Sequence, residues 1–393
     1  MLMSSDPPLR LTLIFVCIFL HFFNSAGLFF SHSFPEQFYT FNGEQVDFLD
    51  VSAKVNFLLR IAGAYFLGKA ADKIGFIKVM KIICLLNIFV SLLLTFFDTL
   101  HIFEKGILLC LLRSVLAFLR TACFVLPTIY IFRNHTKLEH YKYSAFAWTS
   151  VIAGTIAANL CFNIFPYISA ANWNIIYALS GFFCFMVYSH VIEVPELEIQ
   201  GAVNPISKPT FLLAFLLAGI FGAGISYQYF YIQNYAADVM VIGESSRQLI
   251  YSPFCITLLL AIIPMAQMTK NLKFSEILCQ LLIGILFSVA ILYAFSSLSK
   301  LVLLFHQIIF GIFFGLFMSH VFVAIYRLLR GYHSYFYVSW VLCLGTSCFI
   351  LIIIYLEKWK FVPLPLLGGS LLALLILSCL WLDHHFCLSS SND

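Results

Sequence analysis

Three arginines lie inside long apolar stretches of this sequence: Arg60, Arg113 and Arg120. A charged side chain in hydrocarbon costs at least ~2.5 kcal/mol, so such residues are candidates for function. The seven-residue spacing turns a helix through about 700°, which places Arg113 and Arg120 on one face. Every acidic residue lies in a loop, a tail or the end of an apolar stretch. Arginines in this setting bind carboxylates or phosphates, or they bond the carbonyls and hydroxyls of neighbouring helices.

The elements that position these arginines are membrane-spanning helices. The 393 residues are 62% hydrophobic and only 10% charged, with a mean hydropathy of +0.97. Soluble domains carry about 25% charged residues, so lipid is the main solvent of this chain. Spans need about 20 apolar residues and must be helical, because lipid offers no partner to backbone polar groups. The sequence predicts twelve: 10–31, 51–71, 79–97, 106–132, 143–165, 173–192, 210–235, 248–267, 275–297, 301–328, 334–356 and 362–382.

The basic residues predict the orientation of these helices. With the N-terminus inside, the inside segments hold thirteen lysines and arginines and the outside segments hold six. This asymmetry follows the positive-inside rule and puts both termini in the cytoplasm. The polar segment 193–209 divides the chain into six-helix halves, 1–192 and 210–393. An alternative for the first stretch is a signal peptide ending near Ala26, which leaves eleven spans.

Further polar residues lie in the first, seventh and tenth predicted spans. His21 and Asn24 occupy the first span, and His306 and His320 the tenth. Histidines within a membrane can carry protons, or each can bond a neighbouring helix. The polar residues of the seventh span include Tyr227, Gln228 and Tyr231.

The remaining composition argues against several other classes of protein. The twelve cysteines lie in or next to apolar runs without a C-x-x-C pair, so we expect small buried residues rather than disulfides. No H-E-x-x-H, G-x-S-x-G or paired aspartates occur, so we expect neither an enzyme nor a metal site or cofactor. The net charge of +4 gives no sign of a nucleic-acid partner.

A short charged segment joins the second and third predicted spans with the spacing G-x-x-x-D-K-x-G-x-x-K. This pattern resembles the signature loop between the second and third helices of major facilitator superfamily transporters. The resemblance implies an all-α integral membrane protein with twelve helices in two six-helix bundles. It also implies that Asp72 accepts hydrogen bonds from the start of the eleventh helix, near Ser334. The expected gating loop comprises Gly68, Asp72, Lys73, Gly75 and Lys78.

The residues before this loop resemble the metabolite:proton symporter branch, which includes proline/betaine, α-ketoglutarate, citrate and shikimate carriers. Arg60, Gly63 and Gly68 match the branch pattern, and an arginine at the position of Arg113 is common in the superfamily. The acids that this branch carries in its first and fourth spans are absent. Residues His21 to Ser25 stand where the branch has acidic residues in its first span. In the fourth span, the segment that ends in a glutamate in the branch has no glutamate here and contains Arg120.

The resemblance implies a secondary active transporter that moves a small organic anion or zwitterion by alternating access. We expect proton coupling, a monomer, a lipid bilayer and a bacterial inner membrane, with no nucleic acid. Because the acids are missing, the alternatives are a uniporter or exchanger, or a non-transporting sensor with this fold. The expected substrate-binding residues are Arg60, Arg120, Arg113, Asn24, Tyr227, Gln228 and Tyr231, and the proton-coupling candidates are His21, His306 and His320.

Overall fold

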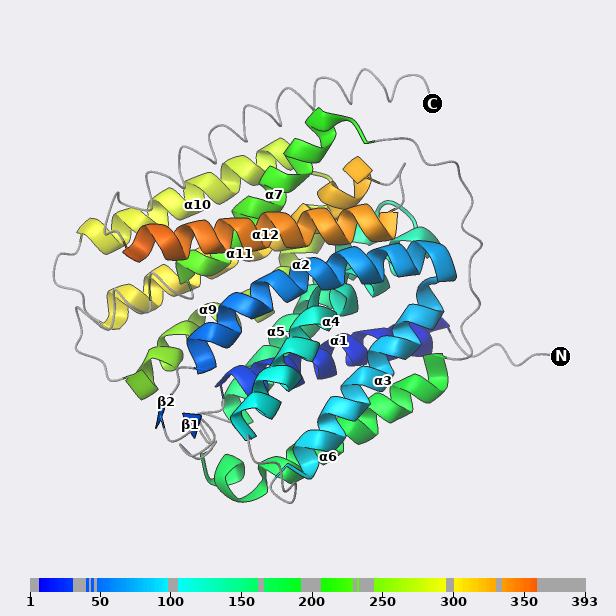
Figure 1. The fold of residues 1–393 in the computed structure, drawn as a ribbon. Helices are drawn as coiled ribbons and strands as arrows, with labels where there is room; N and C mark the ends of the chain where they lie inside the picture. Colours follow the sequence, from blue (N-terminus) through cyan, green and yellow to red (C-terminus); the bar gives the residue numbers. More distant parts are fainter. Residues whose placement is uncertain are drawn as a thin grey trace. The chain divides into compact units, whose positions relative to one another are not determined.

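A computed structural model places helices along most of the chain (Figure 1). The structure describes residues 7–30, 40–41, 44–45, 48–97, 105–161, 166–191, 206–228, 232, 244–294, 300–329 and 334–358. Within these ranges it contains eleven helices and one pair of two-residue strands. The predicted span 362–382 lies outside the described residues.

The helices of the first half follow the first six predicted spans, with ends shifted by several residues at some positions. They are α1 (Pro7–Phe30), α2 (Phe48–Ile74), α3 (Phe76–Thr95), α4 (Lys105–Asn134), α5 (Glu139–Asn159) and α6 (Pro166–Val191). The strands β1 (Thr40–Phe41) and β2 (Glu44–Gln45) pair antiparallel between α1 and α2.

The second half contributes α7 (Lys208–Ser226), α9 (Glu244–Met268), α10 (Phe274–Ala294), α11 (Lys300–Leu329) and α12 (Ser334–Lys358). Across the described residues, five helices are long and apolar enough to cross a membrane by length and composition. They lie in α3, α4, α7, α11 and α12, and shorter apolar helices occur in α1, α6, α9 and α10.

The chain divides into two compact units. Unit 1 comprises Met1–His135, Ser150–Asn204 and His333–Trp340, and unit 2 comprises Thr136–Thr149, Pro205–Tyr332 and Val341–Asp393. Each unit therefore contains the helices of one half together with the beginning of one helix from the other half. The beginning of α12 belongs to unit 1, and the beginning of α5 belongs to unit 2.

In unit 1, α2 packs along α4 and α3 packs along α6 (Figure 1). The first pair crosses so closely that a Cβ atom on Gly63 would lie 1.8 Å from the carbonyl oxygen of Phe118. Gly154 of α5 similarly meets α1, where a Cβ would lie 2.4 Å from the Phe19 carbonyl oxygen. Glycine permits this approach of helix backbones, as it does in many membrane bundles.

In unit 2, α11 is the central helix and packs against α7, α9 and α10. A row of rings, formed by Phe310, Phe314 and Phe317, runs along α11, and Phe254 of α9 lies against the first two. On α7, a Cβ on Gly222 would lie 2.5 Å from the Thr346 carbonyl oxygen of α12. Aromatic packing and close glycine contacts therefore hold this unit together.

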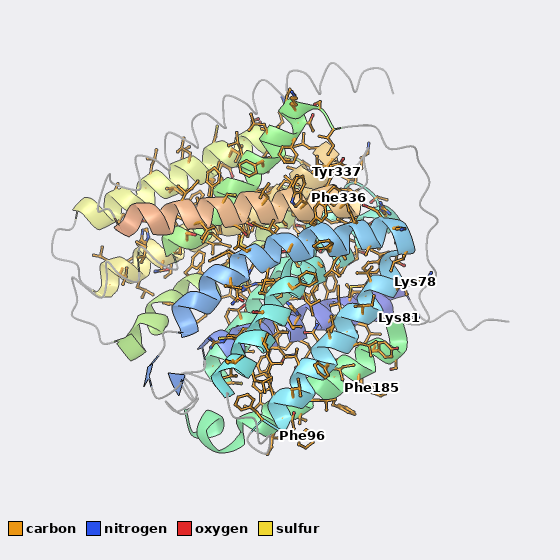
Figure 2. The ribbon with its side chains drawn as sticks, viewed as in Figure 1. Lys78, Lys81, Phe96, Phe185, Phe336 and Tyr337 are labelled. Carbon is orange, nitrogen blue, oxygen red and sulfur yellow. The ribbon has the colours of Figure 1, made fainter. Side chains whose placement is uncertain are left out.

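The outer faces of α3 and α6 expose large apolar side chains. Figure 2 shows Lys78 and Lys81 near the start of α3, Phe96 just past its end, and Phe185 on α6. Both labelled phenylalanines are more than half exposed. An apolar helix face with lysines gathered at one end suits a surface covered by lipid.

Candidate functional site

Three pairs of side chains join the parallel helices α1 and α3 in the interior of unit 1. We call them the α1–α3 ladder: Cys17 with Cys84, His21 with Asn87, and Asn24 with Ser91. Successive members on each helix are three or four residues apart, so the pairs lie on facing sides of two helices. All six side chains are buried.

The hydrogen bonds of the ladder determine which nitrogen of His21 carries a proton. The Nδ2 amide group of Asn87 donates to the Ile83 carbonyl oxygen at 2.9 Å, which fixes the direction of the Asn87 amide. Its Oδ1 atom is then the acceptor for His21 Nδ1, 3.0 Å away. Nδ1 is therefore protonated in the neutral ring, and Nε2 holds the lone pair. Nε2 is buried and has no hydrogen-bond partner among the described residues.

Two of the predicted arginines lie near this histidine. Arg60 of α2 and Arg120 of α4 are half-buried, and the charges of both act on the His21 ring. The Arg120 guanidinium carbon lies 5.1 Å from the ring centre of Phe22, the residue after His21. Arg60 instead lies over Phe57 of its own helix α2, with its guanidinium carbon 5.0 Å from that ring centre. Two guanidinium charges thus act on the part of unit 1 that holds the His21 Nε2 lone pair, and this positive potential favours an anion there.

Arg113 and Asn24 have different surroundings from these arginines. Arg113 is buried, and its charge acts on Tyr177 of α6. The Asn24 amide donates to Ser91 at 3.1 Å and accepts from the Ser180 hydroxyl at 2.7 Å. These bonds tie α1 to α3 and α6, so Asn24 stabilises the packing of three helices.

A second polar cluster lies in unit 2 and carries no formal charge. His306 of α11 has its Nδ1 atom 3.0 Å from the Ser288 carbonyl oxygen of α10, so Nδ1 donates. Its Nε2 atom lies 3.4 Å from the amide nitrogen of Gln228, which can donate to the remaining lone pair. Gln228 and Tyr227 follow the last turn of α7 in a wider π-type turn, a feature that often marks functional positions. The ring centres of Tyr227 and His306 are 5.9 Å apart.

Gln307 adjoins His306 on α11 and was not among the substrate-binding or proton-coupling residues predicted from the sequence. It is fully buried, and neither polar atom of its amide has a partner among the described residues. A buried amide without partners costs free energy and commonly marks a site for water or ligand. The signal in the sequence that could have assigned Gln307 to a site is its position next to His306 within an apolar span. Tyr231, the last predicted residue of this region, lies outside the described residues.

The third predicted histidine belongs to a different structure, which we call the α5–α11 junction: Tyr141, His320 and Arg327 with their contacts. The rings of Tyr141 and His320 lie 4.5 Å apart, and His320 Nε2 is 3.4 Å from the Thr269 hydroxyl. Arg327 donates to the Tyr141 hydroxyl at 2.9 Å and to the Lys137 carbonyl oxygen at 3.0 Å. This junction lies within unit 2 and holds the beginning of α5 against α11.

The segment predicted as a charged loop is almost entirely helical: Gly68, Asp72 and Lys73 lie at the end of α2, Lys78 lies in α3, and Gly75 alone falls between the two helices. The end of α2 forms the α2–α12 junction, within unit 1. The Oδ2 atom of Asp72 accepts a hydrogen bond from the Phe336 amide at 2.8 Å, in the first turn of α12. This is the contact that the family resemblance predicts near Ser334. Asp72 thereby satisfies an amide that the helix cannot bond itself and complements the positive end of the helix dipole. A Cβ on Gly68 would lie 2.8 Å from Phe336 Cα, so only glycine permits this contact.

The other loop residues have separate roles. Gly75 adopts φ 94°, a conformation that favours glycine, and begins α3 after the last turn of α2. Lys73 and Lys78 are exposed. Lys69 instead lies over the Tyr65 and Phe336 rings, at 4.2 and 5.3 Å from their centres. Arg133 lies 4.2 Å from the ring centre of Tyr335, so cations and aromatic rings surround the start of α12.

Comparison with known proteins identifies the fold. No protein-family model and no curated protein matches the chain. A bacterial homologue of the iron transporter ferroportin, in an outward-facing state, superposes with a TM-score of 0.71 at 13% identity, over 95% of this chain and 99% of that one. The proton:xylose symporter XylE, a major facilitator superfamily protein, superposes with a TM-score of 0.67 at 12% identity, over 96% of this chain and 95% of that one. The human organic anion transporter MFSD10 superposes with a TM-score of 0.66 at 12% identity, over 96% of this chain and 99% of that one.

Identities this low show the fold alone. The chain has the all-helical major facilitator fold, and with its apolar helices it is a multi-pass membrane protein.

Proposed function

We propose that this protein is a major facilitator transporter, rather than an enzyme, that carries a small organic anion across a membrane by alternating access. The observation that carries the proposal is the placement of Arg60, Arg120 and the unpartnered Nε2 atom of His21 within unit 1. The fold supports transport as the class of activity, since the structures that share it include a symporter and an organic anion transporter.

The two half-buried arginines are the proposed receptor for the substrate. Guanidinium groups bind carboxylate and phosphate through pairs of charge-assisted hydrogen bonds. Arg60 and Arg120 come from different helices, α2 and α4, and the proposal is that one anion bonds to both. The proposal leaves Asn24 out of the substrate site, because its amide bonds α3 and α6. Arg113 is also left out, because it lies near Tyr177.

His21 is the proposed proton-coupling residue. Its Nδ1 proton is bonded to Asn87, so a second proton enters at Nε2. The two nearby arginine charges oppose a third positive charge, and a bound anion offsets them. Substrate binding and proton uptake then favour each other, which is the thermodynamic requirement for symport. His306 is less suited to this role, because Gln228 lies beside its Nε2 lone pair.

The α2–α12 junction is the proposed gate. The start of α12 is held to the end of α2 by the Asp72–Phe336 hydrogen bond, the close approach at Gly68, and the packing of Tyr65 and Lys69 on the Phe336 ring. Because all of these contacts are non-covalent, the junction can break and re-form during a transport cycle. The positive-inside asymmetry places this junction at the cytoplasmic face. We further propose a monomer in a bacterial inner membrane with both termini in the cytoplasm.

The first test is a thermal-shift screen of purified protein against carboxylates, betaines, amino acids and sugar phosphates, because a ligand raises the melting temperature by mass action. The binder is then radiolabelled and offered to proteoliposomes. The proposal predicts uptake that a proton gradient accelerates. Binding without flux under any gradient would instead identify a sensor, and flux that ignores the proton gradient would identify a uniporter or exchanger.

A further inference from the structure

Four helices of unit 1 each bring one cysteine to the same part of its interior. They are Cys17 of α1, Cys84 of α3, Cys123 of α4 and Cys184 of α6, and all four are free, buried thiols. Among the described residues no group of three or more potential ligands is arranged to hold a metal ion. We infer that Cys17 and Cys84 are a modification site, at which a small peroxide oxidises the two thiols to a disulfide that joins α1 to α3.

The geometry selects this pair from the four thiols. The sulfur atoms of Cys17 and Cys84 lie 3.8 Å apart, in van der Waals contact. The Cys123 thiol lies 4.0 Å from the backbone carbonyl oxygen of Cys17, to which it donates. Cys184 is near enough to interact electrostatically with Cys17, but it also bonds Ser180. A disulfide requires the two side chains to rotate until the sulfurs reach the bond length of ~2.0 Å.

The chemistry balances in two steps with hydrogen peroxide as the oxidant. One thiol attacks the peroxide, the O–O bond breaks, and a sulfenic acid and one water form. The second thiol then attacks the sulfenic sulfur, the S–O bond breaks, and the disulfide and a second water form. Two thiols lose two electrons and two hydrogens, and the peroxide is reduced to two waters. Because the second sulfur is already in contact, this condensation outruns further oxidation of the sulfenic acid.

Burial restricts which oxidants can act. Cys17 is 5% exposed and Cys84 1%, so bulky reagents cannot reach either sulfur. Buried thiols also react slowly, because the thiolate is disfavoured away from water. A peroxide is small, uncharged and membrane-permeant, so we expect slow oxidation that is specific to this pair. The disulfide would fix one end of the α1–α3 ladder, one helical turn from His21.

The experiment uses the purified full-length protein in detergent, treated with hydrogen peroxide. After quenching, the protein is denatured, alkylated and mapped by mass spectrometry. We expect two of the twelve cysteines to escape alkylation, a peptide of α1 linked to a peptide of α3, and a higher melting temperature, all reversed by dithiothreitol. Cys17→Ser and Cys84→Ser should each abolish the link. Cys343→Ser, which removes a buried cysteine of α12, should retain it.

Two results would overturn the inference. One is that Cys17 and Cys84 remain fully alkylated at a peroxide dose that oxidises the half-buried Cys279 of α10. The other is a link from Cys17 or Cys84 to Cys123, to Cys184 or to a second copy of the chain. The peptide map of the wild-type protein decides between these outcomes even if a serine variant fails to fold. It also requires no substrate, so it is independent of the proposed transport activity.

Discussion

Unit 1 and unit 2 are both built from apolar helices but differ in the chemistry of their polar interiors. In each unit a buried histidine donates from Nδ1, His21 to Asn87 and His306 to the Ser288 carbonyl. In unit 1 the second nitrogen has no partner among the described residues and lies near two arginines. In unit 2 the second nitrogen faces the Gln228 amide, in a cluster without formal charge.

The junctions at the ends of the helices differ in a similar way. In unit 1 a carboxylate, Asp72, caps the beginning of α12. In unit 2 a guanidinium, Arg327, bonds the chain between α4 and α5. Two units built from apolar helices can therefore hold different polar chemistry, because helix positions depend on packing and each polar site needs only locally matched partners.

The largest expected effect comes from the closest helix crossing. Gly63→Ala should prevent folding or lower stability by at least ~3 kcal/mol, because the new Cβ meets a backbone oxygen 1.8 Å away. The corresponding crossing of α9 and α11 is looser. Gly311→Ala places its Cβ 3.1 Å from Thr257 and should change stability by less than about 1 kcal/mol, since alanine favours the helix. The two variants are compared by their yield of monodisperse protein and their melting temperature. Equal losses of yield or melting temperature would contradict the difference in packing between the two helix crossings.

The next effect concerns the arginines of unit 1. Arg60→Ala and Arg120→Ala should each weaken binding of the substrate anion by about 10- to 100-fold, since a charge-assisted hydrogen bond contributes ~1.5–3 kcal/mol. Lys81→Ala, which removes a positive charge from the start of α3, is the control and should bind normally. Titration calorimetry measures the change. Wild-type affinity in both arginine variants would exclude the proposed anion site.

The two histidines provide the sharpest contrast between the units. His21→Gln should abolish acceleration of uptake by a proton gradient but preserve exchange of labelled for unlabelled substrate, because binding by the arginines remains. His306→Gln should leave the dependence on the gradient intact. Uptake and exchange in the same proteoliposomes separate the two activities. Loss of coupling in the His306 variant alone would move the proton site to unit 2.

The smallest expected effect is at the junctions. Asp72→Ala should destabilise the protein by about 0.5–2 kcal/mol, the usual contribution of a helix cap, and should also slow transport. Glu139 caps its own helix α5 through the Thr136 amide and hydroxyl, so Glu139→Ala should cost similar stability without slowing transport. Chemical denaturation and initial uptake rates test both variants. If the Asp72→Ala and Glu139→Ala variants transport at the same rate, Asp72 acts only as a helix cap.

The sequence predicted the helices and the charged segment between the second and third spans because both are local signals, although that segment is helical except at Gly75. Apolar runs of about 20 residues mark spans without reference to other parts of the chain. Gly68, Asp72 and Gly75 lie in one short segment, and the structure places Asp72 at the start of α12 as the resemblance implies. The ladder could not be predicted, since its pairs are 66 or 67 residues apart and belong to uniformly apolar helices. No amphipathic pattern showed which face of α1 met α3.

The predicted arginine cluster shows the same limit. Helical spacing places Arg113 and Arg120 on one face of α4. The two arginines lie about two turns apart along α4, and each turn contacts a different neighbouring helix. Arg113 therefore lies near Tyr177 of α6, and Arg120 near Phe22 of α1. Only the packed bundle separates the two. Gln307 was not assigned to the predicted site for the same reason, because burial without a partner is a property of the folded unit.

The most direct test of the account follows protons and substrate together. Proteoliposomes containing a trapped pH-sensitive dye receive the organic anion identified by the thermal-shift screen, without an imposed gradient. The account predicts acidification of the lumen by the wild-type protein, none by Arg120→Ala, and exchange without acidification by His21→Gln. Anion uptake and acidification that persist at wild-type rates in both variants would contradict the claim that Arg60, Arg120 and His21 form the anion- and proton-binding site.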